Sequence, residues 1–252
     1  MSKRIVLVTG GAKGIGRGIS ERFLAAGATV ICCGREMPKT LPAHGGRQVE
    51  FIEADVRDAG ARDQLFAEIS RKHGRLDVLV NNAGGSPFAM ADKASPRFHE
   101  SIINLNLLAP FHLAQKANAL MQAQGEGVIV FIGSVSASRP SPGTAAYGAA
   151  KAGVLSLVQS LAIEWAPKVR IVAVSPGLVR TEQSELHYGD DKGIAAVSAT
   201  VPLGRMATPE EVGDACVWLS SPQASYVSGA NLVLHGGGES PSFLAAATVN
   251  KS

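Results

Sequence analysis

Seven short apolar runs, rich in β-branched residues, alternate along the chain with segments of helical spacing. The runs are RIVLVT, TVICC, EFIEA, LDVLV, VIVFI, RIVAV and NLVLHG. Strands that are apolar at almost every position are typical of a parallel sheet covered on both faces. Helical spacing occurs at about 15–26, 59–73, 97–123, 144–166 and 209–220. The alternation predicts an α/β fold, a doubly wound parallel sheet of about seven strands with helices on both faces.

No repeat, low-complexity tract or linker interrupts this alternation, so we expect a single domain over residues 1–252. Two stretches depart from the pattern. Residues 178–206 follow a strand without a clean apolar period, and we expect them to form a lid over a substrate site. Residues 239–252 form a tail past the last strand, and we expect 241–249 to pack near the substrate opening, the alternative being a frayed end.

Composition narrows the possible functions. Hydrophobic residues make up 46% of the 252 positions, and the 28 glycines suit the tight turns of an α/β protein. The net charge is only +3 and the basic residues are scattered, which disfavours nucleic-acid binding. We expect a cytoplasmic protein with no membrane segment, because no signal peptide or long apolar run is evident.

The cysteines and histidines indicate neither disulfides nor a metal. Cys32 and Cys33 are adjacent within an apolar run, so we expect them to face opposite sides of a strand as small buried hydrophobes. Cys216 stands alone, and no histidine has metal-ligand spacing with a second His or Cys. We therefore predict no metal site.

A glycine-rich turn follows the first predicted strand and opens the first predicted helix. In VLVTGGAKGIG, Gly10, Gly14 and Gly16 have the spacing Gly-x3-Gly-x-Gly. Glycines allow a tight turn and close approach to a pyrophosphate, whose charge is met by the helix N-terminus. No Gly-Lys-Ser/Thr follows, so the turn is not a P-loop. The strand–turn–helix context predicts dinucleotide binding.

Two cations distinguish between NADP(H) and NAD(H). An NAD-selective fold usually carries an acidic residue at the end of the second strand, where this chain has Gly34 followed by Arg35. Together with Lys13 in the glycine turn, Arg35 could bind a 2′-phosphate. The alternative is a solvated turn arginine. We expect NADP(H) to be preferred, with NAD(H) possible.

A helix face carries a candidate acid/base pair. Tyr147 and Lys151 are four residues apart, which places them on one face of the helix predicted at 144–166. An ammonium close to a phenol would favour the phenolate and lower its pKa, making the pair a plausible general acid/base, although alone it could be a surface contact. Ser134 ends the run GVIVFIGS and could bind the same substrate oxygen.

A proline lies inside the helix predicted at 97–123. Pro110 has no N–H, so the carbonyl of Asn106, four residues earlier, loses its helical donor. That carbonyl could bind a water instead, or the proline could simply kink the helix around its neighbours.

These motifs together resemble the short-chain dehydrogenase/reductase family over about residues 3–238. The resemblance rests on TGGAKGIG (9–16), ADV (54–56), NNAG (81–84), Asn106, Ser134, YGAAK (147–151) and PGLVRT (176–181), in this order. It implies a Rossmann-type oxidoreductase that is a homotetramer. One departure is His235 where the family usually has aspartate, which we interpret as structural.

The resemblance also implies roles for individual residues. Tyr147 would be the proton donor and acceptor, Ser134 would orient the carbonyl or alcohol, and Lys151 would bind the ribose and lower the tyrosine pKa. Asn106 would hold a water that relays protons to solvent. The cofactor-binding residues implied by the motifs and by the resemblance are Gly10, Lys13, Gly14, Ile15, Gly16, Arg35, Asp55, Val56, Asn82, Ala83, Gly84, Tyr147, Lys151, Pro176, Gly177, Val179 and Thr181.

The predicted activity is NADP(H)-dependent hydride transfer with a secondary alcohol or ketone. The alternative is a redox sensor that binds the dinucleotide without turnover, but such sensors tend to lack the tyrosine or lysine. An extended-branch epimerase or dehydratase, or an enoyl reductase, fits the glycine and Tyr–Lys spacings less well. The lid segment has few charges, and the loop at 84–90 adds two large apolar side chains, which suggests an alicyclic, steroid-like or acyl substrate. The residues concerned are Leu186, His187, Tyr188, Ile194 and Val197 in the lid segment, and Phe88 and Met90 in the loop.

Overall fold

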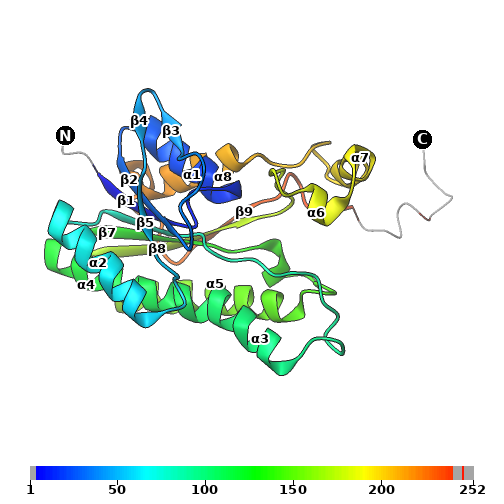
Figure 1. Ribbon diagram of the computed structural model, residues 1–252, viewed down its shortest axis with the longest axis horizontal. Coiled ribbons are helices and arrows are strands. Elements are labelled where there is room, and N and C mark those ends of the chain that lie inside the picture. The colour runs from blue at the N-terminus through cyan, green and yellow to red at the C-terminus, as the bar shows by residue number, and fades with distance from the viewer. Residues whose placement is uncertain (1–3, 241–245, 247–252) are drawn as a thin grey trace.

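The computed structural model describes residues 4–240 and residue 246, and it confirms the predicted seven-stranded parallel sheet (Figure 1). Each neighbouring pair of its strands runs parallel. In spatial order the strands are β5 (Glu50–Glu53), β2 (Thr29–Gly34), β1 (Ile5–Thr9), β6 (Val78–Asn81), β7 (Gly127–Ile132), β8 (Val169–Pro176) and β9 (Asn231–Leu234). The order changes direction between β1 and β6, the switch point at which such sheets bind ligands.

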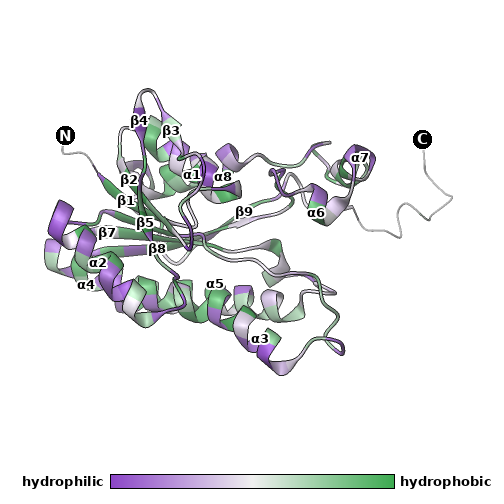
Figure 2. Cartoon of the chain, viewed as in Figure 1, coloured by the Kyte–Doolittle hydropathy of each residue, from purple (hydrophilic) through white to green (hydrophobic). Residues whose placement is uncertain are grey.

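Helices cover both faces, as the sequence predicts. One apolar core joins the sheet to α2 (Ala59–His73), α4 (Ala109–Gln124) and α5 (Ala145–Glu164), and the other joins it to α1 (Gly14–Ala25) and α8 (Pro209–Ser220). Figure 2 shows apolar strands lying between these helices. Cys33 belongs to the first core and Cys32 to the second, so the two thiols do face opposite sides of β2.

The helix predicted at 97–123 is present as a continuous helical run, but one of its turns is π-helical instead of α-helical. The structure has α3 (Pro96–Ile103), a π-helical turn over Asn104–Leu108, and α4. The N–H of Ala109 donates to the carbonyl of Asn104, five residues back. Pro110 consequently lies in the first turn of α4, where a missing N–H costs little. The proline is accommodated by one wide turn beside the site rather than by a kinked α-helix.

Two smaller features were not predicted. A hairpin of β3 (Ala43–His44) and β4 (Arg47–Gln48) turns at Gly45 and Gly46, whose φ values of +55° and +75° suit a type I′ turn. The Gly-Gly pair was a usable signal. The segment predicted as a lid contains two short helices, α6 (Glu185–Tyr188) and α7 (Asp191–Ala199).

One described helix, α5, is long and apolar enough to cross a membrane by length and composition alone, which the sequence analysis did not anticipate. Val154, Val158 and Leu161 of α5 are buried in the core beneath the sheet. A core helix that packs on a sheet meets the same criteria as a membrane span, so this finding carries little weight.

Candidate active site

Loops from the carboxyl ends of the central strands meet at the switch point of the sheet. The hydroxyl of Thr9, at the end of β1, accepts hydrogen bonds from the backbone N–H groups of Asn82 and Ala83, both at 3.0 Å. The amide of Asn82 donates back to the carbonyl of Thr9 at 2.9 Å. The glycine turn and the NNAG loop are thus bound together into one rigid edge.

The glycine turn has the geometry that the sequence predicts. Gly10 and Gly14 have φ values of +62° and +53°, which favour glycine. A Cβ on Gly16 would lie 2.2 Å from the carbonyl oxygen of Gly10, so no side chain fits there. Ile15 and Gly16 form the first turn of α1, with Lys13 exposed as its N-cap. The turn therefore presents backbone N–H groups and one cation at its open side.

Tyr147 and Lys151 lie one turn apart near the start of α5, and Lys151 is buried. The ammonium nitrogen of Lys151 lies 5.5 Å from the centroid of the Tyr147 ring and donates to the carbonyl of Ile132 at 2.7 Å. Ser134 follows β7, and its hydroxyl accepts from the backbone N–H of Ser136 at 3.1 Å. The structure thus brings the predicted serine, tyrosine and lysine together at the end of β7.

Burial controls the charge of this pair. Burial raises the pKa of Tyr147, and a hydrogen bond with Ser134 opposes that rise. Burial also lowers the pKa of Lys151 to about 8. We expected the ammonium to lower the pKa of Tyr147, but the net direction in this structure is upward because the phenol is removed from water.

Asn106 lies in the π-helical turn and is fully buried. Its side-chain oxygen accepts from the N–H of Gly85 at 2.8 Å, and its amide donates to the carbonyls of Gly85 and Ile102 at 3.0 and 2.9 Å. A Cβ on Gly84 would lie 2.7 Å from that side-chain oxygen and 3.5 Å from the Lys151 nitrogen. The side chain of Asn106 is therefore occupied in fixing the NNAG loop beside Lys151.

Asp55 and Val56, which we expect to contact the adenine, follow β5 at the edge of the sheet, next to β2. Arg57 holds Asp55 in a two-pronged ion pair, with 2.6 Å between the closest atoms, and lowers its pKa. Arg35 adds a weaker attraction to the same carboxylate. The buried Arg62 donates to the carbonyl of Val56 at 2.7 Å. Arg57 is a further cation here that was not predicted, although its place directly after ADV is visible in the sequence.

The PGLVRT segment (176–181) lies at the other end of the predicted cofactor site from Asp55 and Val56. Pro176 ends β8, and the N–H of Gly177 donates to the carbonyl of Leu234 at 2.9 Å. Val179 forms a β-bridge with Ala207. The first contact joins the end of β8 to β9, and the second joins the start of the lid segment to the chain just before α8.

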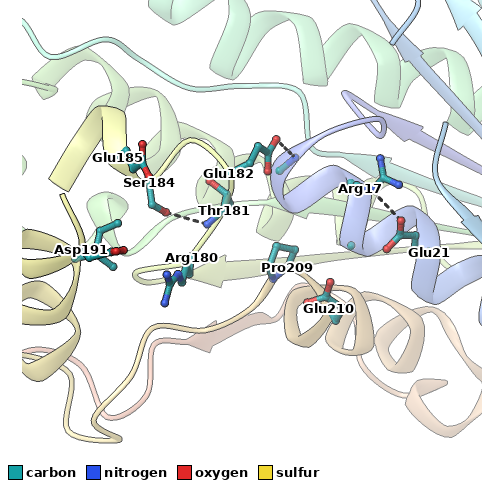
Figure 3. Close-up of a pocket in the computed structure, with 13 residues that line it drawn as sticks. Arg17, Glu21, Arg180, Thr181, Glu182, Ser184, Glu185, Asp191, Pro209 and Glu210 are labelled. Atoms are coloured by element: carbon teal, nitrogen blue, oxygen red, sulfur yellow. Dashed lines mark hydrogen bonds and ion pairs between the residues drawn. The ribbon is translucent and has the colours of Figure 1, made fainter. Parts of the chain in front are cut away.

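A cavity of about 460 Å³ lies between α1, the lid segment and α8 (Figure 3). Gly14 and Thr181 are the predicted cofactor residues on its wall, and Ser134, Tyr147 and Lys151 do not line it. One contact there was not anticipated: the carboxylate of Glu182 accepts a hydrogen bond from the N–H of Gly14 at 2.9 Å. An anion therefore binds at the helix start where the sequence predicts a pyrophosphate.

The loop that follows Ser134 contacts the segment that follows β9. Arg139, in this loop, forms an ion pair with Glu239 at 2.9 Å. Neither residue was predicted to make such a contact. The predicted packing of 241–249 lies outside the described residues and stays a prediction. Among the residues that the structure describes, no cluster of His, Cys, Asp and Glu could hold a metal.

Comparison with known proteins agrees with this geometry. The family model described as enoyl-(acyl carrier protein) reductase matches residues 10–239. The chain is 34% identical over 247 residues to a probable 2,4-dienoyl-CoA reductase of Bacillus subtilis (strain 168), covering 94% of this chain and 97% of that protein. It is 37% identical over 238 residues to the 3-oxoacyl-[acyl-carrier-protein] reductase MabA of Mycobacterium bovis, covering 93% and 92%. The chain belongs to the short-chain dehydrogenase/reductase family.

A solved structure supports the same assignment for the fold. The aldohexose dehydrogenase of Thermoplasma acidophilum superimposes with a TM-score of 0.87 at 30% identity, over 99% of this chain and 97% of that one. This short-chain dehydrogenase/reductase is thus an oxidoreductase that acts on CH–OH or C=O groups, and its family uses NAD(P)(H). The three similar proteins are named for different substrates, so the substrate has to be argued from the site.

Proposed function

We propose that this protein is an NADP(H)-dependent oxidoreductase that interconverts a secondary alcohol and a ketone. The observation that carries the proposal is the grouping of Ser134, Tyr147 and Lys151 at the switch-point edge, with the lysine nitrogen 5.5 Å from the tyrosine ring. A redox sensor that only binds the dinucleotide would not need this acid/base group. The retained pair therefore favours turnover.

The residues present fit an anionic dinucleotide. The N–H of Gly14 already binds a carboxylate, that of Glu182, which shows that this helix start accepts an anion. At Gly14 the nearest atom to a Cβ position is the Thr181 methyl carbon, at 3.9 Å, so a phosphate can approach the backbone closely there. When bound, the nicotinamide supplies or accepts a hydride at the carbonyl carbon of the substrate.

The protein's own residues would handle the proton. Because the pKa of Tyr147 is raised, its hydroxyl stays protonated at neutral pH and can donate to the oxygen of a ketone as that oxygen gains charge. Ser134, which shares a hydrogen bond with Tyr147, would hold the same oxygen. Lys151 would bind the ribose, and the backbone carbonyl of Asn106 would hold a water that returns protons from solvent. Alcohol oxidation, which needs the phenolate, should therefore rise with pH.

Two exposed cations carry the preference for NADP(H). The N–H of Gly10 donates to the carbonyl of Cys33 at 2.9 Å, which joins the glycine turn holding Lys13 to the end of β2, just before Arg35. The 2′-hydroxyl of NAD(H) carries no charge, so neither cation would form an ion pair with it. This arrangement supports a 2′-phosphate at that corner of the site.

We expect kcat/KM with NADPH to exceed that with NADH by about ten- to a hundredfold, the value of one charge-assisted contact. Arg35→Asp should remove most of this preference. Arg71→Asp, an exposed arginine on the last turn of α2, should leave it unchanged. Equal kcat/KM for the two cofactors in the unmodified enzyme would contradict the NADP(H) assignment.

Exposed apolar side chains on the loop at 84–90 and on α6 support an apolar substrate. Phe88 is 73% exposed, yet its ring lies against Gly143, where a Cβ would come within 2.0 Å of it. The N–H of Ala89 donates to the carbonyl of Gly143 at 2.8 Å, which joins the loop at 84–90 to the loop between Ser134 and Tyr147. Met90 and Leu186 are exposed as well. We therefore favour an alicyclic, steroid-like or acyl substrate.

Reduction of a C=C bond is a second candidate, because the matched family model and one relative carry enoyl or dienoyl reductase names. The one-turn spacing of Tyr147 and Lys151 favours C=O chemistry over this alternative.

We further propose that the enzyme is a cytoplasmic homotetramer that binds neither nucleic acid nor membrane. Exposed apolar side chains support an assembly; they include Ile163, Trp218, Tyr226, Leu232 and Val233.

A further inference from the structure

The lid segment touches the start of α1 through one side chain. The N–H of Gly14, the first residue of α1, donates to a carboxylate oxygen of Glu182 at 2.9 Å (Figure 3). The methyl group of Thr181 lies 3.9 Å from the position that a Cβ on Gly14 would take. Residues 181 and 182 therefore lie directly against the predicted pyrophosphate site.

A local turn holds Glu182 in this position. The hydroxyl of the buried Ser184 accepts from the N–H of Thr181 at 2.9 Å, and the hydroxyl of Thr181 accepts from the N–H of Gln183 at 3.2 Å. The N-cap of α1, Lys13, makes no side-chain capping hydrogen bond. Glu182 thus supplies, from 168 residues along the chain, an acceptor that the helix start lacks locally.

We propose that Glu182 is an internal competitor of the cofactor's pyrophosphate. In the free enzyme its carboxylate satisfies the N–H of Gly14 and latches the lid segment to α1. A pyrophosphate at the same N–H would be repelled by the carboxylate, because both groups are anions attracted to one helix start. Cofactor binding therefore has to release Glu182. This inference rests on the proposed dinucleotide-binding function.

The structure offers the released carboxylate another place. The adjoining cavity of about 460 Å³ extends from Gly14 along the lid segment (Figure 3). Its other carboxylates are Glu21, Glu185, Asp191 and Glu210, so Arg180 is the cation of the lid segment that a released carboxylate could approach. Val179 and Thr181, which we expect at the nicotinamide, flank Arg180 and precede Glu182 in the same segment. Release of Glu182 would therefore shift the lid segment at the moment when the cofactor arrives, and would couple cofactor binding to the position of the lid.

The test compares Glu182→Gln and Glu182→Ala with the unmodified enzyme by fluorescence titration of NADPH in the absence of substrate. We expect the Kd for NADPH to fall by about two- to fivefold in both variants, the range for an exposed charged contact. Inorganic pyrophosphate, as a probe without nucleoside, should also bind more tightly. Glu185→Gln is the matched control, since Glu185 lines the same cavity from α6. The Kd of this control variant for NADPH should not change.

Hydrogen exchange in the free protein gives a readout that needs no cofactor. Without the latch, amides of residues 181–188 should exchange faster in Glu182→Ala than in the unmodified protein or in Glu185→Gln. A Kd for NADPH that is unchanged or higher in the Glu182 variants would overturn the proposal. If the unmodified protein bound neither NADPH nor NADH, the proposed function would fail, and the exchange rates would still decide for or against the latch.

Discussion

Tyr147→Phe is expected to lower kcat by about 10²- to 10⁴-fold, the usual contribution of a positioned general acid/base. The substitution removes the transferable proton and the hydrogen bond with Ser134 but keeps the ring beside the Lys151 ammonium. The Kd for NADPH and the melting temperature should therefore remain close to those of the unmodified enzyme. Steady-state kinetics and a cofactor titration on the same preparation measure both.

Tyr226→Phe is a suitable control for this substitution, because Tyr226 is fully exposed and outside the site. It should leave kcat unchanged. Retention of more than a few per cent of kcat in Tyr147→Phe would show that another group moves the proton. A large loss of NADPH affinity would instead indicate that the phenol serves mainly to bind the cofactor.

Lys151→Met is expected to abolish turnover without destabilising the fold. Burial lowers the pKa of Lys151 to about 8, so at pH 7 the folded protein holds a buried ammonium at a cost of about 3 kcal/mol. Methionine removes this cost, while loss of the 2.7 Å hydrogen bond leaves the carbonyl of Ile132 unpaired, which costs about 1–3 kcal/mol. We expect the free energy of unfolding at pH 7 to be unchanged or higher by up to about 2 kcal/mol.

The pH dependence of this difference has a definite sign. Between about pH 8 and the ordinary lysine value of 10.5, the unfolded chain binds more protons than the folded protein. The free energy of unfolding of the unmodified protein therefore rises relative to that of Lys151→Met as the pH rises through this window. Denaturant unfolding at pH 7 and pH 9.5 measures the change. Lys168→Met is the control, because Lys168 also donates to a carbonyl, at 3.0 Å, but is exposed. A variant that is much less stable at pH 7 would contradict the account.

Local patterns in the sequence were sufficient for the sheet and most helices. The apolar β-branched runs mark the seven strands: β1, β2, β6, β7 and β8 are buried, and the edge strands β5 and β9 keep the same apolar pattern although they are partly exposed. Helices α2 and α8 have the predicted bounds of 59–73 and 209–220. The π-helical turn at Asn104–Leu108 was not predictable in the same way. A helical period continues through residues 97–123, and the hydrogen bond of Asn106 in this turn with Gly85 depends on tertiary packing that the period does not encode.

The candidate site was likewise predictable only where local patterns determine it. Ser134, Tyr147 and Lys151 could be found because strand ends and helical spacing place them at one edge. The net direction of the Tyr147 pKa was misjudged, since burial depends on the whole fold. The contact of Glu182 with Gly14 joins residues 168 positions apart, and no local pattern encodes it.

Transfer of deuterium from C4-deuterated NADPH tests the central claim most directly. The enzyme would be supplied with alicyclic, steroid-like and 3-oxoacyl ketones, and with a 2,4-dienoyl thioester, and the products analysed by mass spectrometry and NMR. The account predicts deuterium on the carbinol carbon of a ketone-derived alcohol, at a rate that falls at least a hundredfold in Tyr147→Phe. Deuterium found only on a saturated carbon from the dienoyl thioester, or NADPH that binds but transfers to none of these compounds, would contradict it.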